Sequence, residues 1–287
     1  NLSGWLDTIL AGLLTVGAIA VLGYAQLFYL LPISLFGLAI AASELPELSR
    51  KRGAVEEFLV PRVRGALERT TSLVLPSALA YLVLGDVFIA ALFQRGEFTP
   101  ATTAVSHAVL AAYSLGLPAS ASSRVLSSAF YALRDTRTPA RIAYLRVAVS
   151  LVVGVSLMFP LDGFSIGELR LGAVGLALGA AVGAWIEYGL LRRSLARPLG
   201  SHGPPWSRMG KLAVAGVVAT GAGLGAKILL GFSLRPALLA DLLGGDSLLM
   251  DPLAAVGTAG AFGVAYLGTA ALLGVGIPLR RRPSEAP

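Results

Sequence analysis

The sequence contains no cysteine, only two histidines and few charged residues for its length. Without cysteine it can form no disulfide, and it offers no thiolate for catalysis or metal binding. His107 and His202 lie on different stretches, so a metal-dependent hydrolase would lack its ligands. Charged residues make up 14% of the chain, whereas about a quarter of an average soluble domain is charged. Together with a mean hydropathy of +0.76, this composition indicates a membrane protein.

Sequence motifs that mark common enzyme active sites are also missing. The chain has no G-x-S-x-G nucleophile elbow, no H-E-x-x-H zinc pair, no P-loop and no G-x-G-x-x-G dinucleotide fingerprint. A membrane enzyme would need a cluster of carboxylates or histidines at one depth, and the sequence indicates none. We therefore expect that the protein is not an enzyme and holds no metal or other cofactor.

What the chain has instead is eight apolar stretches. Each is about long enough to cross a bilayer, whose hydrocarbon core requires about 20 apolar residues per helix. A tight turn around Gly23–Gln26 would join the first two. We expect an all-α, polytopic bundle of eight transmembrane helices over Trp5–Leu22, Leu27–Ser43, Ser72–Phe93, Ala101–Tyr131, Ile142–Phe159, Leu171–Leu191, Leu212–Leu230 and Pro252–Val275.

Arginine and lysine are concentrated on every second connection between these spans. Of the 23 Lys and Arg residues, 18 follow the second, fourth or sixth span or lie in the C-terminal tail. Cytoplasmic loops retain positive charge, so we expect both ends of the chain to be cytoplasmic. Because the net charge of +7 is placed at membrane edges, it predicts contacts with anionic lipid headgroups and no nucleic-acid partner.

The polar segment Ser49–Thr71 leaves two structural alternatives open. Its apolar residues recur every three or four positions, for example at Leu59, Val63 and Leu67. That spacing is typical of an amphipathic helix lying on the cytoplasmic membrane surface. The segment could equally be a soluble extension of the helix that follows it.

Glycines recur in the sixth span at Gly175, Gly179 and Gly183. Small residues at four-residue spacing allow two helices to approach closely in a membrane. Gly221 and Gly225 repeat the pattern in the seventh span. We expect both sets to pack helices tightly within one bundle.

Ionisable side chains inside the spans are candidates for function, because charge at bilayer depth is costly and usually faces the bundle interior or a wet cavity. Arg124 lies in the fourth span and could bind a phosphate or carboxylate. Its alternative roles are an ion pair with Asp86, Asp7 or Glu187, or a side chain that extends to the nearby cytoplasmic membrane surface. Asp7 could also belong to a cation site or proton relay, or cap a helix start. Two further candidates near span ends are Gln26 and Glu44, and His107 is interpreted as a structural histidine.

Three segments resemble a known family. The first reads L-P-I-S-L-F-G-L-A-I over Leu31–Ile40 and E-L-P-E-L-S-R over Glu44–Arg50. The second is L-F-Q-R-G-E-F-T over Leu92–Thr99. The third reads A-Y-S-L-G-L-P over Ala112–Pro118 and A-F-Y-A-L-R-D-T-R-T-P over Ala129–Pro139. In order and spacing they resemble the MurJ (MviN) family of lipid II flippases, of the multidrug/oligosaccharidyl-lipid/polysaccharide exporter superfamily. The most specific residues form a cytoplasmic loop: Arg134, Asp135, Thr136, Thr138 and Pro139.

The resemblance implies two six-helix lobes around a central cavity, followed by two further helices. This chain would supply the second lobe (1–191) and the last two helices with a basic tail (192–287). A first lobe would precede it, which agrees with a start at Asn1 rather than Met. The implied partners are membrane lipids, the missing first lobe and the undecaprenyl-pyrophosphate-linked cell-wall precursor. Rocking of the lobes would move this precursor across the bacterial cytoplasmic membrane.

The sequence departs from the family pattern where cargo is bound. Family members commonly carry a cavity arginine in a Y-A-D-R stretch, and the matching residues here are Tyr24-Ala25-Gln26-Leu27. Leucine cannot bind a pyrophosphate. Two alternatives therefore stay open: export of another lipid-linked oligosaccharide, and a non-transporting scaffold in cell-wall assembly.

Some family members also use a sodium site in this lobe. Asp7 matches an acidic position there, but Gly154 and Met158 supply no obvious partner ligands. We therefore predict no metal site. Coupling of transport to sodium, to protons or to the membrane potential stays open.

Overall fold

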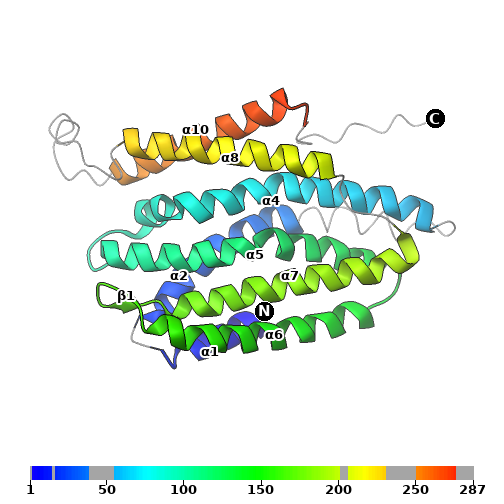
Figure 1. Cartoon of the computed structure of the whole chain (residues 1–287), viewed down its shortest axis with the longest axis horizontal. Coiled ribbons are helices and arrows are strands. Elements are labelled where there is room, and N and C mark those ends of the chain that lie inside the picture. Colours follow the sequence, from blue (N-terminus) through cyan, green and yellow to red (C-terminus); the bar gives the residue numbers. More distant parts are fainter. Residues whose placement is uncertain (1, 15–16, 39–54, 201–205, 231–249, 276–287) are drawn as a thin grey trace.

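The computed structural model describes residues 2–14, 17–38, 55–200, 206–230 and 250–275. Within them the chain folds into eight α-helices and one short antiparallel β-hairpin (Figure 1). The all-α class is confirmed, with this hairpin as the only β structure in the described ranges. The elements are α1 (Leu2–Ala11), α2 (Ala18–Pro32) with its π-helical continuation η1 (Ile33–Leu38), α4 (Val55–Phe93), α5 (Pro100–Ala132), α6 (Arg137–Asp162), β1 (Ser165–Ile166), β2 (Leu169–Arg170), α7 (Gly172–Leu199), α8 (Trp206–Leu229) and α10 (Met250–Leu272).

The N-terminal hairpin differs from the expectation. Seven described helices are long and apolar enough to cross a membrane, but the expected span Trp5–Leu22 is not one of them. α1 ends at Ala11 and α2 begins at Ala18, so α2 runs through Gly23–Gln26, where the turn was predicted. Gly17 has a φ of +97°, which suits glycine, and a Cβ there would lie 3.0 Å from Leu169. Because the residues beside the turn are apolar, hydropathy alone did not reveal it.

Alternate connections lie at opposite ends of the bundle (Figure 1). One end holds the α1–α2 and α4–α5 turns and the β-hairpin. The other, which we call the basic end, holds the α5–α6 turn and the end of α7. Nine arginines lie on helix ends or turns there: Arg62, Arg64, Arg134, Arg137, Arg141, Arg192, Arg193, Arg197 and Arg208. Because alternate connections lie at the same end, the arginines predicted on every second connection gather at one end of the bundle.

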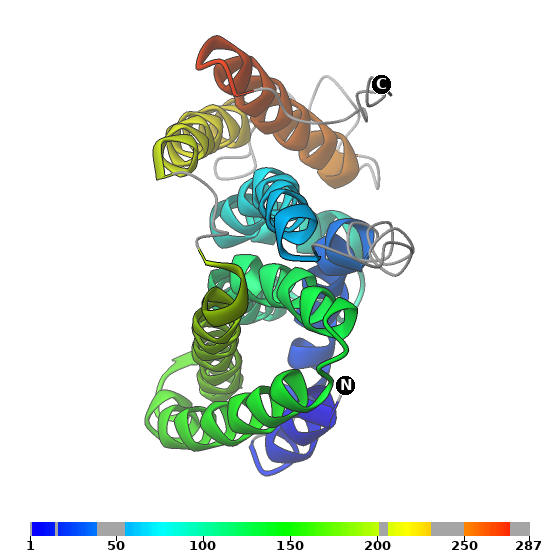
Figure 2. The same ribbon diagram turned by 90° about the vertical axis from the view of Figure 1, so that its right-hand side faces the viewer.

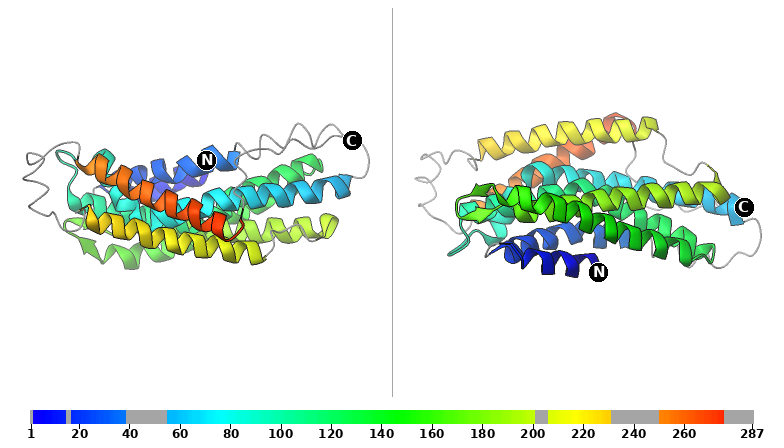
Figure 3. Two further views of the ribbon diagram at one scale, coloured as in Figure 1. Left: turned by 90° about the horizontal axis from the view of Figure 1, so that it is seen from above. Right: turned by 60° about the horizontal axis from the view of Figure 1, so that its bottom comes forward.

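Five helices form a closed ring. α2 packs on α5, α5 on α7, α7 on α6, α6 on α1, and α1 on α2. Figure 2 views this ring end-on. α4 packs outside the ring, chiefly on α5, and the α8–α10 hairpin covers the outer side of α4 (Figure 3). The molecule thus has three parts: the ring, α4 and the hairpin.

α4 decides between the two alternatives for the segment Ser49–Thr71. It runs without interruption for 39 residues, about 58 Å at 1.5 Å per residue. The first half of α4 therefore extends the spanning helix, and the prediction of a separate helix on the membrane surface is wrong. Leu59, Val63 and Leu67 are buried in a cluster with the last turns of α5 and α7. Residues 49–54 lie outside the described ranges.

α6 and α7 pack backbone against backbone along a contact that we call the α6–α7 seam. A Cβ on Gly175 would lie 2.5 Å from the Met158 nitrogen, and one on Gly179 would lie 2.5 Å from the Gly154 nitrogen. Real Cβ atoms do not approach backbone so closely, so only glycine fits at these positions. The predicted tight packing of this glycine series is confirmed.

The matching prediction for α8 is wrong. A Cβ on Gly221 or Gly225 would have no atom within 4 Å. α8 instead approaches α4 at Gly223, where a Cβ would lie 2.6 Å from Leu84. The contact there is backbone against a flexible side chain, which is looser than the α6–α7 seam.

A proline in α4 creates a bond between α4 and α10. Pro76 has no N–H to donate to the Ser72 carbonyl, one turn earlier in the helix. The Tyr266 hydroxyl of α10 donates to that carbonyl at 2.8 Å. The hairpin therefore satisfies the backbone group that the proline leaves free.

Candidate functional site

A chain of hydrogen bonds joins three helices of the ring. Asp7 of α1 is 7% exposed, and its Oδ2 accepts a hydrogen bond from the Tyr113 hydroxyl of α5 at 3.4 Å. The Tyr113 hydroxyl in turn accepts one from Gln26 Nε2 of α2 at 3.2 Å. Tyr29 stacks on Tyr113 with ring centroids 5.0 Å apart, and its hydroxyl lies 2.8 Å from Ser120 Oγ. Two of the candidate residues, Asp7 and Gln26, therefore meet through one tyrosine.

The places predicted for these two residues were wrong. Asp7 lies in the middle of α1 rather than at its start, so it caps no helix. Gln26 lies in the middle of α2 rather than near a span end. The error for Gln26 follows from the misplaced first turn, and the error for Asp7 follows because α1 begins at Leu2 rather than at Trp5.

Glu187 of α7 pairs with Arg146 of α6. Arg146 Nη1 lies 2.6 Å from Glu187 Oε2, and the two side chains are 24% and 11% exposed. The close contact between α6 and α7 determines which residues of the two helices face each other. One turn before Glu187, a Cβ on Gly183 of α7 would overlap the Ser150 hydroxyl of α6. Arg146 Nε and Ser150 Oγ are buried without a hydrogen-bond partner among the described residues.

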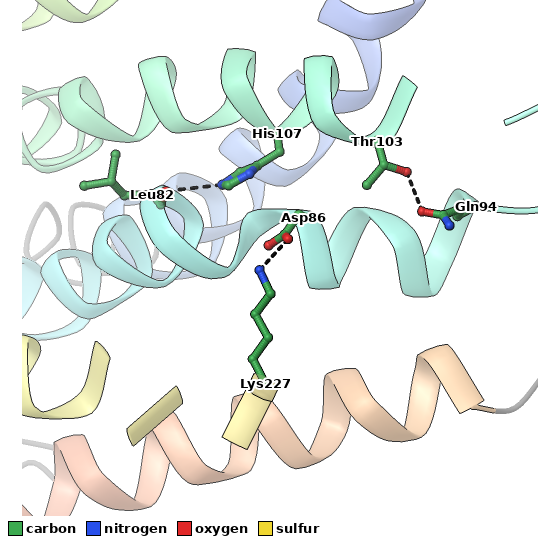
Figure 4. Close-up of polar contacts among 6 residues, drawn as sticks. All are labelled: Leu82, Asp86, Gln94, Thr103, His107 and Lys227. Carbon is green, nitrogen blue, oxygen red and sulfur yellow. Dashed lines mark hydrogen bonds and ion pairs between the residues drawn. The ribbon is translucent and has the colours of Figure 1, made fainter. Parts of the chain in front are cut away.

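A second ion pair joins α4 to α8 toward the end opposite the basic one. Lys227 Nζ lies 2.5 Å from Asp86 Oδ2. Figure 4 shows the two side chains pointing toward each other between their helices. His107 of α5 contacts α4 beside this pair, with its Nε2 3.2 Å from the Leu82 carbonyl oxygen. This contact between helices fits the structural role expected of the histidine.

Arg124 lies in the last third of α5 and is half-buried. Each of the three acidic partners suggested for it is bound to another residue. Arg124 forms no ion pair within the part of the chain that the structure describes. The ion-pair alternative is therefore wrong for these partners.

In the family-like loop between α5 and α6 the chain reverses direction, and hydrogen bonds there cap the end of α5 and the start of α6. Arg134 has a φ of 60° and is the only non-glycine residue with positive φ in the described ranges. The N–H groups of Arg134 and Asp135 donate to the Tyr131 and Phe130 carbonyls at 3.0 and 2.9 Å, which closes α5. Asp135 Oδ1 then accepts the Thr138 N–H at 3.0 Å and starts α6. Hydrogen bonds from the Thr138 side chain and backbone lower the pKa of the Asp135 carboxyl below its usual range.

The second family-like segment is built in a similar way. Gly96 has a φ of +57°, which reverses the chain after α4. Thr99 Oγ1 accepts the Thr102 N–H at 3.2 Å and caps α5, with a proline at the next position. The Thr103 hydroxyl donates to Gln94 Oε1 at 2.8 Å and ties the turn to α5 (Figure 4).

Three residues that carry the polar contacts were not among the sequence candidates. Tyr113 stood in a family-like segment without a role of its own. Arg146 lies well inside α6. Lys227 lies in the last turn of α8. The only signal in the sequence was that both cations border apolar stretches.

A family profile described as "Lipid II flippase MurJ" matches residues 1–236 of the chain. The chain belongs to the MurJ lipid II flippase family. The probable lipid II flippase MurJ of Rhizobium meliloti (strain 1021) is 34% identical over 209 residues, which cover 72% of this chain and 37% of the relative. The corresponding protein of Vibrio cholerae is 32% identical over 220 residues, covering 75% of this chain and 40% of the relative. The chain thus spans well under half the length of these relatives.

A solved structure has the same fold. The lipid II flippase MurJ in its inward closed conformation matches with a TM-score of 0.66 and 19% identity, covering 94% of this chain and 51% of that one. The expected MurJ-like helix bundle is therefore confirmed. As a member of this family, the chain belongs to a multi-pass membrane protein.

Proposed function

We propose that this chain forms the second lobe and the last two helices of a flippase for lipid II. The cargo is the undecaprenyl-pyrophosphate-linked disaccharide-pentapeptide, moved from the inner to the outer leaflet of the bacterial cytoplasmic membrane. The match of residues 1–236 to the lipid II flippase family carries the proposal. In it, α1–α7 form the second lobe, α8 and α10 are the additional pair, and a first lobe faces the ring.

The charge distribution supports an orientation for this half. Positive residues are retained on the cytoplasmic side of membranes. The basic end would therefore face the cytoplasm, where lipid II is collected. A cytoplasmic N-terminus, as the charge pattern predicted, does not fit α1, which runs only from Leu2 to Ala11 and starts about midway along the bundle (Figure 1). The opposite end would open to the outer leaflet.

The polar side chains of the ring support a transport role. A flippase must shelter a pyrophosphate and sugars from hydrocarbon while the lipid tail stays in the membrane. Asp7, Gln26, Arg146 and Glu187 place polar groups on four helices of the ring. Charged groups inside membranes are costly and mark transport pathways. Rocking of two lobes would then expose such a pathway to each side in turn.

Arg124 is our candidate for contact with the cargo in this lobe. It has no ion pair in the described ranges, and a guanidinium binds phosphate oxygens in pairs. Leu27, where family members carry an arginine, is 58% exposed on α2 and offers no charge. The phosphate would therefore rely on Arg124 and on cations from the first lobe.

The exposed Leu27 also supports a second candidate function. A lobe without its usual cation could serve another lipid-linked oligosaccharide, or act as a scaffold in cell-wall assembly. Replacing Leu27 by arginine distinguishes a lipid II flippase from a scaffold. The added cation should raise the transport activity of a weak lipid II flippase, and it should leave a scaffold unaffected.

The proposal is tested by complementation of a flippase-depleted strain with the full-length protein. We expect growth with the unchanged protein and loss of growth with Arg124→Ala at equal membrane abundance. Arg193→Ala serves as the matched control, because Arg193 is an exposed arginine on the basic end of α7. Normal growth of Arg124→Ala would contradict the role of Arg124, and failure of the unchanged protein would contradict lipid II as cargo.

A further inference from the structure

Four long helices, α4 to α7, run through most of the bundle, and each contributes to two separate hydrophobic cores (Figure 1). The outer core takes residues from 105–113 of α5 and 173–177 of α7. The basic core takes residues from 125–130 of α5 and 191–195 of α7. From α4 and α6, the outer core includes Ile89 and Met158, and the basic core includes Leu59, Val63, Ala66, Leu67 and Ile142. These helices therefore connect two bodies, an outer body and a basic body, each with its own core.

Three neighbouring helices have a proline in the layer between the two cores. Pro32 ends α2, Pro76 lies in α4 and Pro118 lies in α5. Residues beside these prolines meet in one small cluster that belongs to neither core, formed by Ile33, Val74, Ala78, Leu117 and Ala121. A proline removes a backbone hydrogen bond and kinks its helix. The helical ladders are therefore interrupted at one common level, which we call the joint.

Neighbouring helices supply hydrogen bonds to the backbone at the joint. In α4, the Tyr266 hydroxyl donates to the Ser72 carbonyl at 2.8 Å. In α5, Trp185 Nε1 of α7 donates to the Leu115 carbonyl at 2.9 Å, beside the proline. Such donors from neighbouring helices are what makes interrupted ladders tolerable in a membrane. α2 continues after its proline as the π-helical η1, a form that is frequent at functional sites.

α6 and α7 cross the joint through small residues. A Cβ on Gly116 of α5 would lie 2.6 Å from the Ala181 Cα, which places this part of α7 beside the proline of α5. Gly179 and Gly183 lie on either side of Ala181 along α7, and Gly154 faces Gly179 from α6. Glycine weakens a helix because no side chain restricts its backbone. Each of the four long helices thus has a proline or glycine where it passes between the cores.

The same layer contains buried polar atoms that the present arrangement leaves unpaired. Arg146 binds Glu187 through Nη1 at 2.6 Å, but its Nε has no partner among the described residues. The Ser150 hydroxyl, one turn further along α6, has none there either. Buried polar groups of folded proteins are nearly always hydrogen-bonded. These two groups are therefore available to a second arrangement of the joint.

We infer that the basic body pivots on the outer body about this joint, so that the lobe bends within itself in addition to rocking as a whole. Arg124 lies beyond Pro118 in the basic body, whereas Asp7 and Gln26 lie on the outer side of the joint. Bending therefore moves the arginine assigned to the cargo relative to the rest of the ring. The role of Arg124 rests on the proposed function, but the bending does not depend on which lipid-linked cargo is carried.

Distances between spin labels test the bending directly. The chain contains no cysteine, so labels within it attach only at introduced cysteines, once any cysteine elsewhere in the full-length protein is replaced by serine. One pair lies in the basic body, at Tyr131 and Arg193, and one in the outer body, at Glu97 and Glu168; all four residues are exposed. A third pair, Arg193 with Glu97, spans the joint. Pulsed electron paramagnetic resonance measures the distances in lipid nanodiscs without cargo.

The expected result is one distance for each pair within a body, and two distances, several Å apart, for the pair that spans the joint. Because all labels lie in this lobe, rocking of the whole lobe changes none of these distances. Bending about the joint changes only the third.

A double variant, Pro76→Ala with Pro118→Ala, restores both helical ladders. We expect a single distance across the joint and loss of growth in complementation at equal membrane abundance. The unfolding midpoint should not fall, because alanine favours a helix, whereas a merely structural role of the prolines predicts a lower midpoint. Pro61→Ala is the matched control and should change neither distance nor growth, because Pro61 is an exposed proline of α4 within the basic body.

The inference is overturned by a single distance across the joint in the unchanged protein, by two distances within either body, or by a double variant that keeps both distances. If the double variant does not fold, the three pairs in the unchanged protein still decide. The distances are measured without cargo, so their outcome is separate from that of complementation, which tests lipid II as the cargo.

Discussion

The α6–α7 seam and the seam between α4 and the α8–α10 hairpin join helices in opposite ways. In the first, glycines bring backbone against backbone, and one ion pair, Arg146–Glu187, lies along the contact. In the second, leucine side chains fill the space, and polar bonds occur at three heights on α4. The bonds are Arg208–Glu68 at 3.1 Å, Tyr266 to the Ser72 carbonyl at 2.8 Å, and Lys227–Asp86 at 2.5 Å.

The difference shows two solutions to one physical problem. Apolar contact alone gives helices in a membrane little reason to associate, because lipid tails are equally apolar. One solution is close packing of surfaces that no larger side chain permits. The other is a set of polar bonds that lipid cannot replace. The first seam should therefore be sensitive to added volume, and the second to the loss of polar groups.

The largest effect is expected from Gly179→Ala in the α6–α7 seam. The new Cβ would lie 2.5 Å from the Gly154 nitrogen, and backbone cannot move aside as a side chain can. We expect a loss of about 3 kcal/mol of stability, at the upper end of overpacking effects. Thermal unfolding of the purified protein measures it, with Gly189→Ala as control, because a Cβ there meets nothing within 4 Å. Equal stability of both variants would show that the seam is not tightly packed.

Asp86→Ala should have the next largest effect, in the second seam. It leaves Lys227, which is 14% exposed, without its partner. The expected loss is about 2 kcal/mol, between the values for exposed and buried pairs. The exchange Asp86→Lys with Lys227→Asp should recover part of it. Without any recovery, the cost of Asp86→Ala would not come from the pair.

A smaller effect is expected from Tyr266→Phe. It removes one hydroxyl and leaves the Ser72 carbonyl unsatisfied, at a cost of about 1.5 kcal/mol. In a Pro76→Ala background, the residue 76 N–H can satisfy that carbonyl, so the cost of Tyr266→Phe should nearly vanish. Unfolding midpoints of the four proteins in this cycle measure the coupling. Equal costs in both backgrounds would separate Tyr266 from the proline.

The smallest effect should come from Asp135→Ala, which lies in neither seam. Asp135 precedes the N-cap residue Thr136, but its carboxylate accepts the N–H groups of Arg137 and Thr138 as an N-cap side chain would, and losing such a cap costs about 1 kcal/mol. Because the pKa of Asp135 is lowered in the folded protein, its contribution is complete above its ordinary pKa and is lost as pH falls through the lowered value. The stability difference between the two proteins should therefore be constant near neutral pH and shrink only in acid, below about pH 4. A difference that shrinks already at neutral pH would contradict the capping role.

The sequence predicted the parts of the fold that depend on long apolar runs and on charge. Seven of the eight expected spans lie on the six helices from α4 onward and on the later part of α2, and the basic end matches the charged connections. The first turn was not predictable from hydropathy, because the sequence stays mainly apolar from α1 past Gly17 and into α2. Two of the three family-like segments contain helix reversals, at Gly96 and at Arg134.

The candidate site was predictable only in part. Asp7, Asp86 and Glu187 stood out as acids inside apolar spans, but their partners did not. Contacts between helices depend on register, and register is set by seams such as Gly179 against Gly154 that no single-sequence pattern reveals. The glycines of α8 show this limit, since Gly223 makes the contact that spacing assigned to Gly221 and Gly225.

The most direct test of the central claim is the leaflet distribution of lipid II in cells depleted of their own flippase. The full-length protein is expressed in these cells, and lipid II accessible from outside is measured alongside the protein's abundance in the membrane. We predict that outer-leaflet lipid II returns to the level seen before depletion. Outer-leaflet lipid II that stays at the depleted level, despite normal abundance of the protein, would contradict the proposed function.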